Sequence, residues 1–181
     1  MERIKTHLEW LDIGCGNLLH EWCIWIDLDP HSQASVICNI DEWIPFDDNS
    51  FSFVFAHNII EHSKNLVFVM EEVARVCKND ALVEIIVPHY SSRYAWWDLT
   101  HIRPFSYSSF DGYDGKSKNL KLIDKQFQFI SANNKTLAII LQAFLVIPVV
   151  LSRLFPRFFE RFLCYSFWWI DYIKFTFQVV K

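Results

Sequence analysis

Two of the four glycines in the chain, Gly14 and Gly16, stand together in one short turn. They follow the apolar run Leu8–Ile13, which has the length and composition of a buried strand. Glycines in this position permit a tight turn and let a ligand approach the backbone closely. A nicotinamide-binding fingerprint requires a third glycine, but Leu19 occupies that position. The turn therefore indicates a ligand site and disfavours a dehydrogenase.

The loop Pro88–Pro104 is a second segment whose residues could act in binding or catalysis. It is rich in polar and aromatic residues, and it contains two histidines, His89 and His101. Loops of this length inside a compact domain are commonly functional. We therefore expect it to contribute to a site.

Alternating strands and helices must position these residues. The run Leu66–Cys77 has apolar residues at helical spacing, which predicts a helix with Glu71, Glu72 and Arg75 on its outer face and Asn79-Asp80 at its end. The predicted strands are Leu8–Ile13, Cys23–Asp27, Ser35–Ile40, Phe51–Ala56 and Leu82–Val87. This order predicts an α/β fold with a parallel sheet, in which ligands bind beyond the carboxyl ends of the strands.

The segment LDIGCG, from Leu11 to Gly16, resembles motif I of the Rossmann-like, class I S-adenosylmethionine-dependent methyltransferases. Further segments match this family in the same order, including IPFDDNSF from Ile44 and the turn ending in Glu61-His62. The resemblance covers roughly residues 8–110. It implies a doubly wound, mostly parallel sheet with a final antiparallel strand, and methyl transfer from S-adenosylmethionine.

The resemblance also implies which residues bind this cofactor. Asp27 ends the second strand, where the family's acidic residue holds the two ribose hydroxyls, and Asp29 is the reserve candidate. Asn39 or Asp41 is expected to contact the adenine amine, and the alignment does not say which. The full set of expected cofactor-binding residues is Asp12, Gly14, Cys15, Gly16, Asp27, Leu28, Asn39, Ile40, Asp41 and His57.

A general base is needed if the acceptor is a hydroxyl or an amine that must lose its proton. The candidates are His101, His62 and His89, which come from the two loops expected to flank the sulfonium. His101 lies in a segment, DxTHxRPF, that is similar to one in the related subfamily. We expect no metal. The alternative is a divalent ion on Glu61, His62 and His101, by analogy with plant-type small-RNA 2′-O-methyltransferases, although Asn58 replaces a glutamate of their motif.

The spacing between Asp12 and Asp27 is shorter than the roughly twenty residues of the Rossmann pattern. The first crossover helix is therefore expected to be very short or absent, which leaves the cofactor pocket open. This short version resembles a bacterial subfamily associated with cell-surface polysaccharide pathways. A small-molecule, glycan or lipid-linked acceptor fits that resemblance.

Composition restricts the partners. Acidic residues outnumber basic ones up to residue 115, so the region around the expected site would repel phosphate, and we expect no nucleic-acid partner. The five cysteines include no CxxC pair, which argues against a disulfide framework or a thiolate zinc site. The N-terminus has no features of a signal or transit peptide, so we expect a cytoplasmic protein with one domain, residues 1–181.

The basic and aromatic C-terminal part suggests a different surface. Residues 134–170 are expected to form a helical insertion, split at Pro156, before a final strand Lys174–Val180 that lies beside Leu120–Ile130. This insertion could pack on the sheet, form a homodimer, or make peripheral contact with a membrane through its aromatic and arginine side chains.

Two other functions stay open at this point. The chain could be a module that binds the cofactor without turnover. It could also be a membrane protein with a degenerate cofactor pocket, because Thr136–Leu151 is strongly apolar, although it is shorter than the roughly 20 residues needed to span.

Overall fold

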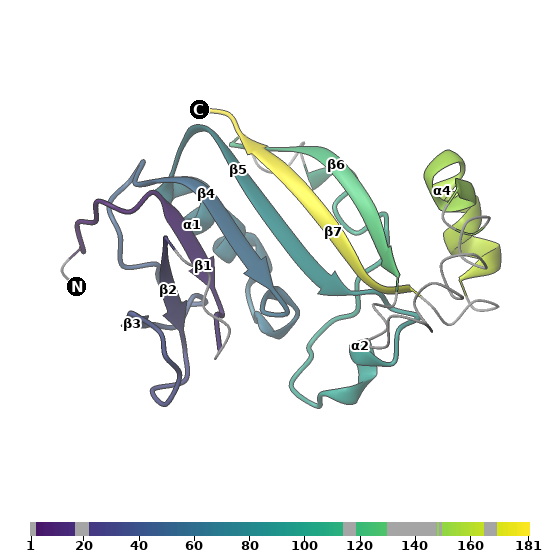
Figure 1. Ribbon diagram of the computed structural model, residues 1–181, viewed down its shortest axis with the longest axis horizontal. Coiled ribbons are helices and arrows are strands. Elements are labelled where there is room, and N and C mark those ends of the chain that lie inside the picture. The colour runs from purple at the N-terminus through teal and green to yellow at the C-terminus, as the bar shows by residue number, and fades with distance from the viewer. Residues whose placement is uncertain (1–2, 17–21, 114–118, 130–147, 149, 165–169) are drawn as a thin grey trace.

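The computed structural model describes residues 3–16, 22–113, 119–129, 148, 150–164 and 170–181. Seven strands form one sheet in the order β3-β2-β1-β4-β5-β7-β6 (Figure 1). Their bounds are β1 Trp10–Ile13, β2 Cys23–Asp27, β3 Val36–Ile37, β4 Phe51–His57, β5 Cys77–Pro88, β6 Leu120–Phe129 and β7 Ile170–Val179. Each strand predicted from the sequence is present, and β3 is much shorter than predicted.

Strands β1 to β5 pair in parallel, whereas β7 runs antiparallel between β5 and β6. Parallel strands need crossover connections, which is why helix α1 (Leu66–Val76) links β4 to β5. The expectation of a mostly parallel sheet with a final antiparallel strand is confirmed. This arrangement places the carboxyl ends of β1, β2, β4 and β5 on one edge of the sheet, together with the start of β7.

Helix α1 buries Val69, Met70, Val73 and Val76 as its apolar spacing predicted. The prediction for its outer face was wrong in part, because Glu72 is buried, with only 9% of its surface exposed. The predicted end was also late. Cys77 already has extended backbone angles and begins β5, so the helix stops before Asn79-Asp80.

Glu72 and Arg75 are drawn inward by the segment that precedes β4. The Arg75 guanidinium donates to both Glu72 carboxylate oxygens, at 2.7 and 2.8 Å, and to the carbonyls of Ile44 and Phe46. The Ile44 amide donates to Glu72 Oε2 at 3.1 Å. The part of the IPFDDNSF segment before β4 is thus fixed to α1 by charge-assisted hydrogen bonds.

Short helices occupy the loops. Turn η1 (Ile60–His62) follows β4, and α2 (Tyr94–Trp97) lies in the long loop after β5. Near the C-terminus, α4 (Pro156–Phe158) starts at Pro156 and continues into a π-helical turn, η3 (Phe159–Leu163). Much of the predicted insertion 134–170 lies outside the described residues, and so does most of the connection between β1 and β2.

No helix within the described ranges is both long and apolar enough to cross a membrane. Most of Thr136–Leu151 lies outside those ranges.

Candidate functional site

The glycine turn and Asp27 form one hydrogen-bonded unit at the ends of β1 and β2. The Gly14 amide donates to the Ile26 carbonyl at 2.8 Å, and the Gly16 amide donates to Asp27 Oδ2, also at 2.8 Å. The Asp29 amide donates to Asp27 Oδ1 at 2.9 Å. Each carboxylate oxygen thus accepts one of these backbone hydrogen bonds, and a carboxylate oxygen can accept a second, as the expected contact with a ribose diol requires.

Gly14 is fixed by two independent constraints. Its φ of +73° is a left-handed conformation that side chains disfavour, and an added Cβ would lie 2.7 Å from the Ile59 side chain. Gly16 has a similar φ of +52°, but no other atom of the described residues lies within 4 Å of its Cβ position. Within that part of the chain, the turn is packed at Gly14 and not at Gly16.

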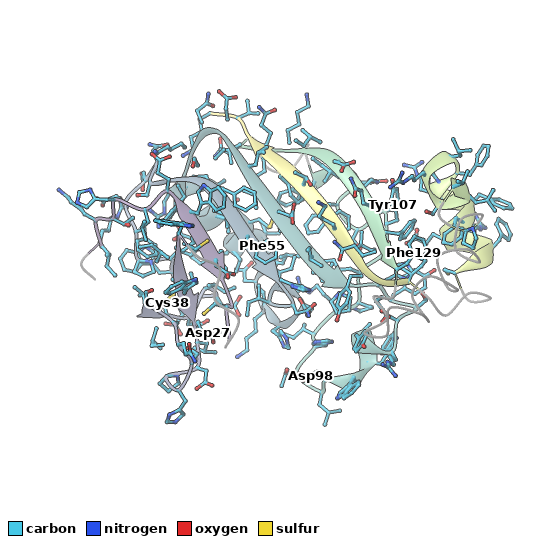
Figure 2. All side chains as sticks on the ribbon, viewed as in Figure 1. Asp27, Cys38, Phe55, Asp98, Tyr107 and Phe129 are labelled. Atoms are coloured by element: carbon cyan, nitrogen blue, oxygen red, sulfur yellow. The ribbon has the colours of Figure 1, made fainter. Side chains whose placement is uncertain are left out.

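A small hollow of about 70 Å³ opens beside this turn, and we call it the cofactor hollow. Among the expected cofactor-binding residues, six line it: Gly14, Asp27, Leu28, Asn39, Ile40 and Asp41. Ile59, His62, Ser63 and Cys38 also line it, and none of these four was among the expected cofactor-binding residues. Figure 2 shows Asp27 and Cys38 at the end of the sheet to which the parallel strands point.

Asp41 and Asn39 both have internal partners. The Asp41 carboxylate accepts from the Ser63 hydroxyl at 2.6 Å and from the Lys64 and Asn65 amides. Burial opposes its ionisation, but these hydrogen bonds outweigh burial and lower the pKa of Asp41. The Asn39 amide nitrogen donates to Glu42. Both side chains therefore shape the wall of the hollow.

The other four expected cofactor residues do not line the cofactor hollow: Asp12, Cys15, Gly16 and His57. Asp12 is buried within β1, and Cys15 is buried in the turn, where burial raises the pKa of its thiol to about 11. The exposed His57 ring packs against Phe55 and Tyr172. Asp12 thus lies in the strand before the turn, Cys15 lies in the turn itself, and His57 contacts Tyr172 of β7.

Glu61, His62 and His101 come together across two loops, and one ligand atom from each lies within 4.8 Å of the others. The rings of His62 and His101 have centroids 4.6 Å apart, and His101 Nε2 lies 3.9 Å from Glu61 Oε1. Glu61 is 1% exposed, and neither of its carboxylate oxygens has a hydrogen-bond partner among the described residues. Burial raises the pKa of Glu61 to about 7.

The hydrogen bonds around the two imidazoles determine where their protons lie. His101 Nδ1 faces the Ala95 carbonyl at 3.1 Å, and a carbonyl only accepts, so Nδ1 carries the proton. His62 Nδ1 contacts the Thr100 hydroxyl at 2.8 Å, and that hydroxyl donates to Asp98 at 2.6 Å. His62 Nδ1 must then be the donor to Thr100. In the neutral form of each ring, Nε2 is then the nitrogen that carries the lone pair.

A second hollow of about 270 Å³, which we call the acceptor hollow, lies on the other side of His62. Its lining is aromatic and polar: Asn58, His62, Pro88, Tyr94, Trp97, Asp98, His101 and Tyr172. Burial and the neighbouring His101 lower the pKa of His62, which favours its neutral form. Tyr172 was missed from the sequence. It reaches this edge because β7 pairs Tyr172 with Pro88 at the end of β5.

His89 does not join the other two histidines. It is fully buried, with Nδ1 at 2.7 Å from the Ser91 hydroxyl and Nε2 at 3.3 Å from Glu160 of η3. Its ring also packs against Phe127 of β6. These contacts make His89 a buried link between the loop after β5 and the C-terminal helical turn, and its expected role in catalysis stays a prediction.

Comparison with known families gives a sequence match between residues 11–85 and a methyltransferase domain. These residues run from β1 into β5 and include the glycine turn, Asp27 and the Glu61-His62 turn. No curated protein matches the chain.

Solved structures share the fold at low sequence identity. The YcgJ protein from Bacillus subtilis is 16% identical, with a TM-score of 0.59 over 99% of this chain and 94% of that one. An S-adenosylmethionine-dependent methyltransferase from Archaeoglobus fulgidus is 13% identical, with a TM-score of 0.57 over 94% and 85%. Phosphoethanolamine N-methyltransferase 2 from Haemonchus contortus, solved with S-adenosylmethionine, is 16% identical, with a TM-score of 0.54 over 98% and 49%.

Proposed function

We propose that this chain, an S-adenosylmethionine-dependent methyltransferase by its matched domain and fold, methylates a hydroxyl group of a small glycan or lipid-linked acceptor. The observation that carries the proposal is the position of His62, which lines both the cofactor hollow and the acceptor hollow. A methyl group presented from one hollow would meet an acceptor bound in the other at this residue.

The acceptor hollow suits a compact ligand with both apolar and polar faces. Tyr94 stacks on Trp97 and on Tyr172, with interplanar angles of 16° and 11°. Trp97 is 71% exposed, and Asn58 and Asp98 supply polar atoms. A sugar ring has an apolar face and hydroxyl groups at its edge, which matches this lining.

S-Adenosylmethionine supplies a methyl group on a sulfonium that leaves as a neutral thioether. The chain has to hold the acceptor oxygen in line with that methyl group, and such orientation can supply about 7–11 kcal/mol of the barrier. The oxygen also has to lose its proton. The cluster of Glu61, His62 and His101 is the set of ionisable groups that the described residues place at the junction.

The proposal is tested by incubating the protein with methyl-labelled S-adenosylmethionine and fractionated glycan and lipid extracts. We expect label in one chemical class. Trp97→Ala should reduce kcat/KM at least tenfold through KM, while the Kd for the cofactor stays unchanged. The control is Trp96→Ala, which removes an equally exposed neighbour whose indole donates to the Tyr90 carbonyl outside the hollow.

Absence of label in every fraction, with cofactor binding intact, would leave a cofactor-binding module without turnover and contradict the proposal.

The C-terminal helical turns support a lipid surface as the partner that presents such an acceptor. Phe155, Phe158 and Phe162 are each more than half exposed. Arg157 and Arg161 accompany these rings on the same short helical segment. Exposed aromatic rings beside arginines fit the boundary between acyl chains and anionic headgroups. A homodimer interface through the same rings is the alternative.

A further inference from the structure

We propose that Glu61, His62 and His101 bind one divalent transition-metal ion, such as Mn²⁺ or Zn²⁺, at the junction of the two hollows. The proposal reverses the expectation from the sequence that no metal is used. The inferred ligands are side-chain atoms of this chain. The inference rests on the proposed function in one respect, because the bound cation would hold the acceptor hydroxyl.

The first argument is the unpartnered carboxylate. A buried ionised group without hydrogen bonds carries a large desolvation cost, so buried charges in proteins are paired or coordinate metals. Both Glu61 oxygens are buried and have no hydrogen-bond partner among the described residues. The nearest cationic candidate in the described residues is His101, and its Nε2 stands at 3.9 Å, beyond hydrogen-bonding distance. The carboxylate lacks the partner that a cation would provide.

The second argument is the orientation of the imidazoles. Histidines that bind metals usually donate the other ring N–H to a carbonyl, a carboxylate or a water, which fixes the tautomer. His101 donates Nδ1–H to the Ala95 carbonyl, and His62 donates Nδ1–H to Thr100, which in turn is held by Asp98. Both Nε2 lone pairs are therefore left for a ligand.

The third argument is the donor set. Two imidazoles and one carboxylate suit Mn²⁺, Fe²⁺ or Zn²⁺, whereas Mg²⁺ and Ca²⁺ prefer oxygen ligands alone. Metal–donor bonds of about 2.0–2.2 Å require the three donor atoms, now within 4.8 Å of one another, to draw slightly together. Three protein ligands leave coordination positions open, and His62 and His101 both line the acceptor hollow, where a substrate hydroxyl could occupy one of them.

The experiment is a titration of the metal-stripped full chain with Mn²⁺ and with Zn²⁺, followed by calorimetry and, for Mn²⁺, by electron paramagnetic resonance. We expect one site per chain. Glu61→Gln should weaken binding at least tenfold, and Glu71→Gln, an exposed glutamate on α1, should leave it unchanged. Circular dichroism checks that each variant is folded.

Thr100→Val gives a sharper test because Thr100 would not touch the metal. Losing the hydrogen bond that orients His62 should weaken binding about 10–100-fold, which an adventitious surface site would not show. No binding by folded protein, or equal binding by Glu61→Gln, overturns the proposal. Methyl transfer without metal binding would refute only the metal site, whereas metal binding without methyl transfer would refute only the proposed function.

Discussion

Gly14 and Gly16 share a left-handed backbone, but among the residues that the structure describes only Gly14 is packed against another side chain. The pair therefore separates backbone strain from steric overlap. Alanine at either position meets the strain of positive φ, roughly 1–2 kcal/mol. At position 14 the new methyl group also collides with Ile59, and overpacking of this kind costs about 1–3 kcal/mol more.

We predict that Gly14→Ala lowers the free energy of unfolding more than Gly16→Ala does, by that overpacking increment. Urea denaturation of the two variants measures the difference. Gly14→Ala should also weaken S-adenosylmethionine binding, because Ile59 lines the cofactor hollow and has to shift. Equal destabilisation by the two substitutions would mean that Ile59 does not constrain the turn.

Among single residues of the site, those that lie in contiguous sequence motifs could be predicted. Gly14 and Asp27 could be found because turn and strand signals surround them. Ser63 and Tyr172 could not, since nothing local distinguishes a serine after a turn or a tyrosine in the last strand. The contact of His89 with Glu160 could not be predicted either, because Glu160 lies far along the chain in a segment with no recognisable motif.

At the scale of elements, the contacts of Glu72 and Arg75 decide how the segment before β4 is held. Burial opposes ionisation of Glu72, but the hydrogen bonds from Arg75 and the Ile44 amide outweigh it and lower the pKa of Glu72. A carboxyl group with a lowered pKa stabilises the folded state above its unfolded pKa of about 4.3. That contribution is lost as the pH falls through the lower, folded-state pKa.

We predict that Glu72→Gln lowers the free energy of unfolding at pH 7 by about 1.5–3 kcal/mol, the usual range for hydrogen bonds to charged groups. The difference from wild type should be constant above about pH 5 and shrink below about pH 4. Denaturation curves at several pH values measure it, with the exposed Glu71→Gln as control. A difference independent of pH would show that the charge of Glu72 is not what stabilises the contact.

Apolar periodicity predicted α1 and its buried face well, since that signal is local. It also placed Glu72 and Arg75 outside, because a polar residue on a helix is exposed unless another segment brings it a partner. That partner, the backbone of Ile44 and Phe46, is distant in sequence, and helical spacing carries no information about it.

At the scale of the whole molecule, the sheet order brings the strand ends beside both hollows to one edge. The backbone of α4 and η3, which carries the exposed Phe158 and Phe162, lies beyond β6 (Figure 1). The mostly parallel sheet could be predicted from the alternation of strands and helix, and its antiparallel last strand from the family resemblance. The partner of the C-terminal surface could not be predicted. A run of aromatic residues in a sequence is equally compatible with membrane contact, with a dimer interface and with a packed core.

We predict that the protein floats with liposomes containing anionic lipid at low salt and that high salt weakens this association, because screening reduces the attraction of the arginines to the headgroups. Replacing Phe158 and Phe162 by serine should abolish flotation. Val67→Ser, which removes an exposed apolar residue on α1, should not. Wild-type protein that stays in the soluble fraction would contradict the lipid surface, and sedimentation would then test the homodimer.

We propose that the methyl group is transferred beside His62, and a crystal structure of the chain with S-adenosylhomocysteine tests this position. We expect the ribose hydroxyls to contact Asp27 and adenine to lie along residues 39–41. The sulfur should point past His62 toward Tyr94, Trp97 and Tyr172. A cofactor bound elsewhere, or one whose sulfur faces away from His62, would contradict it.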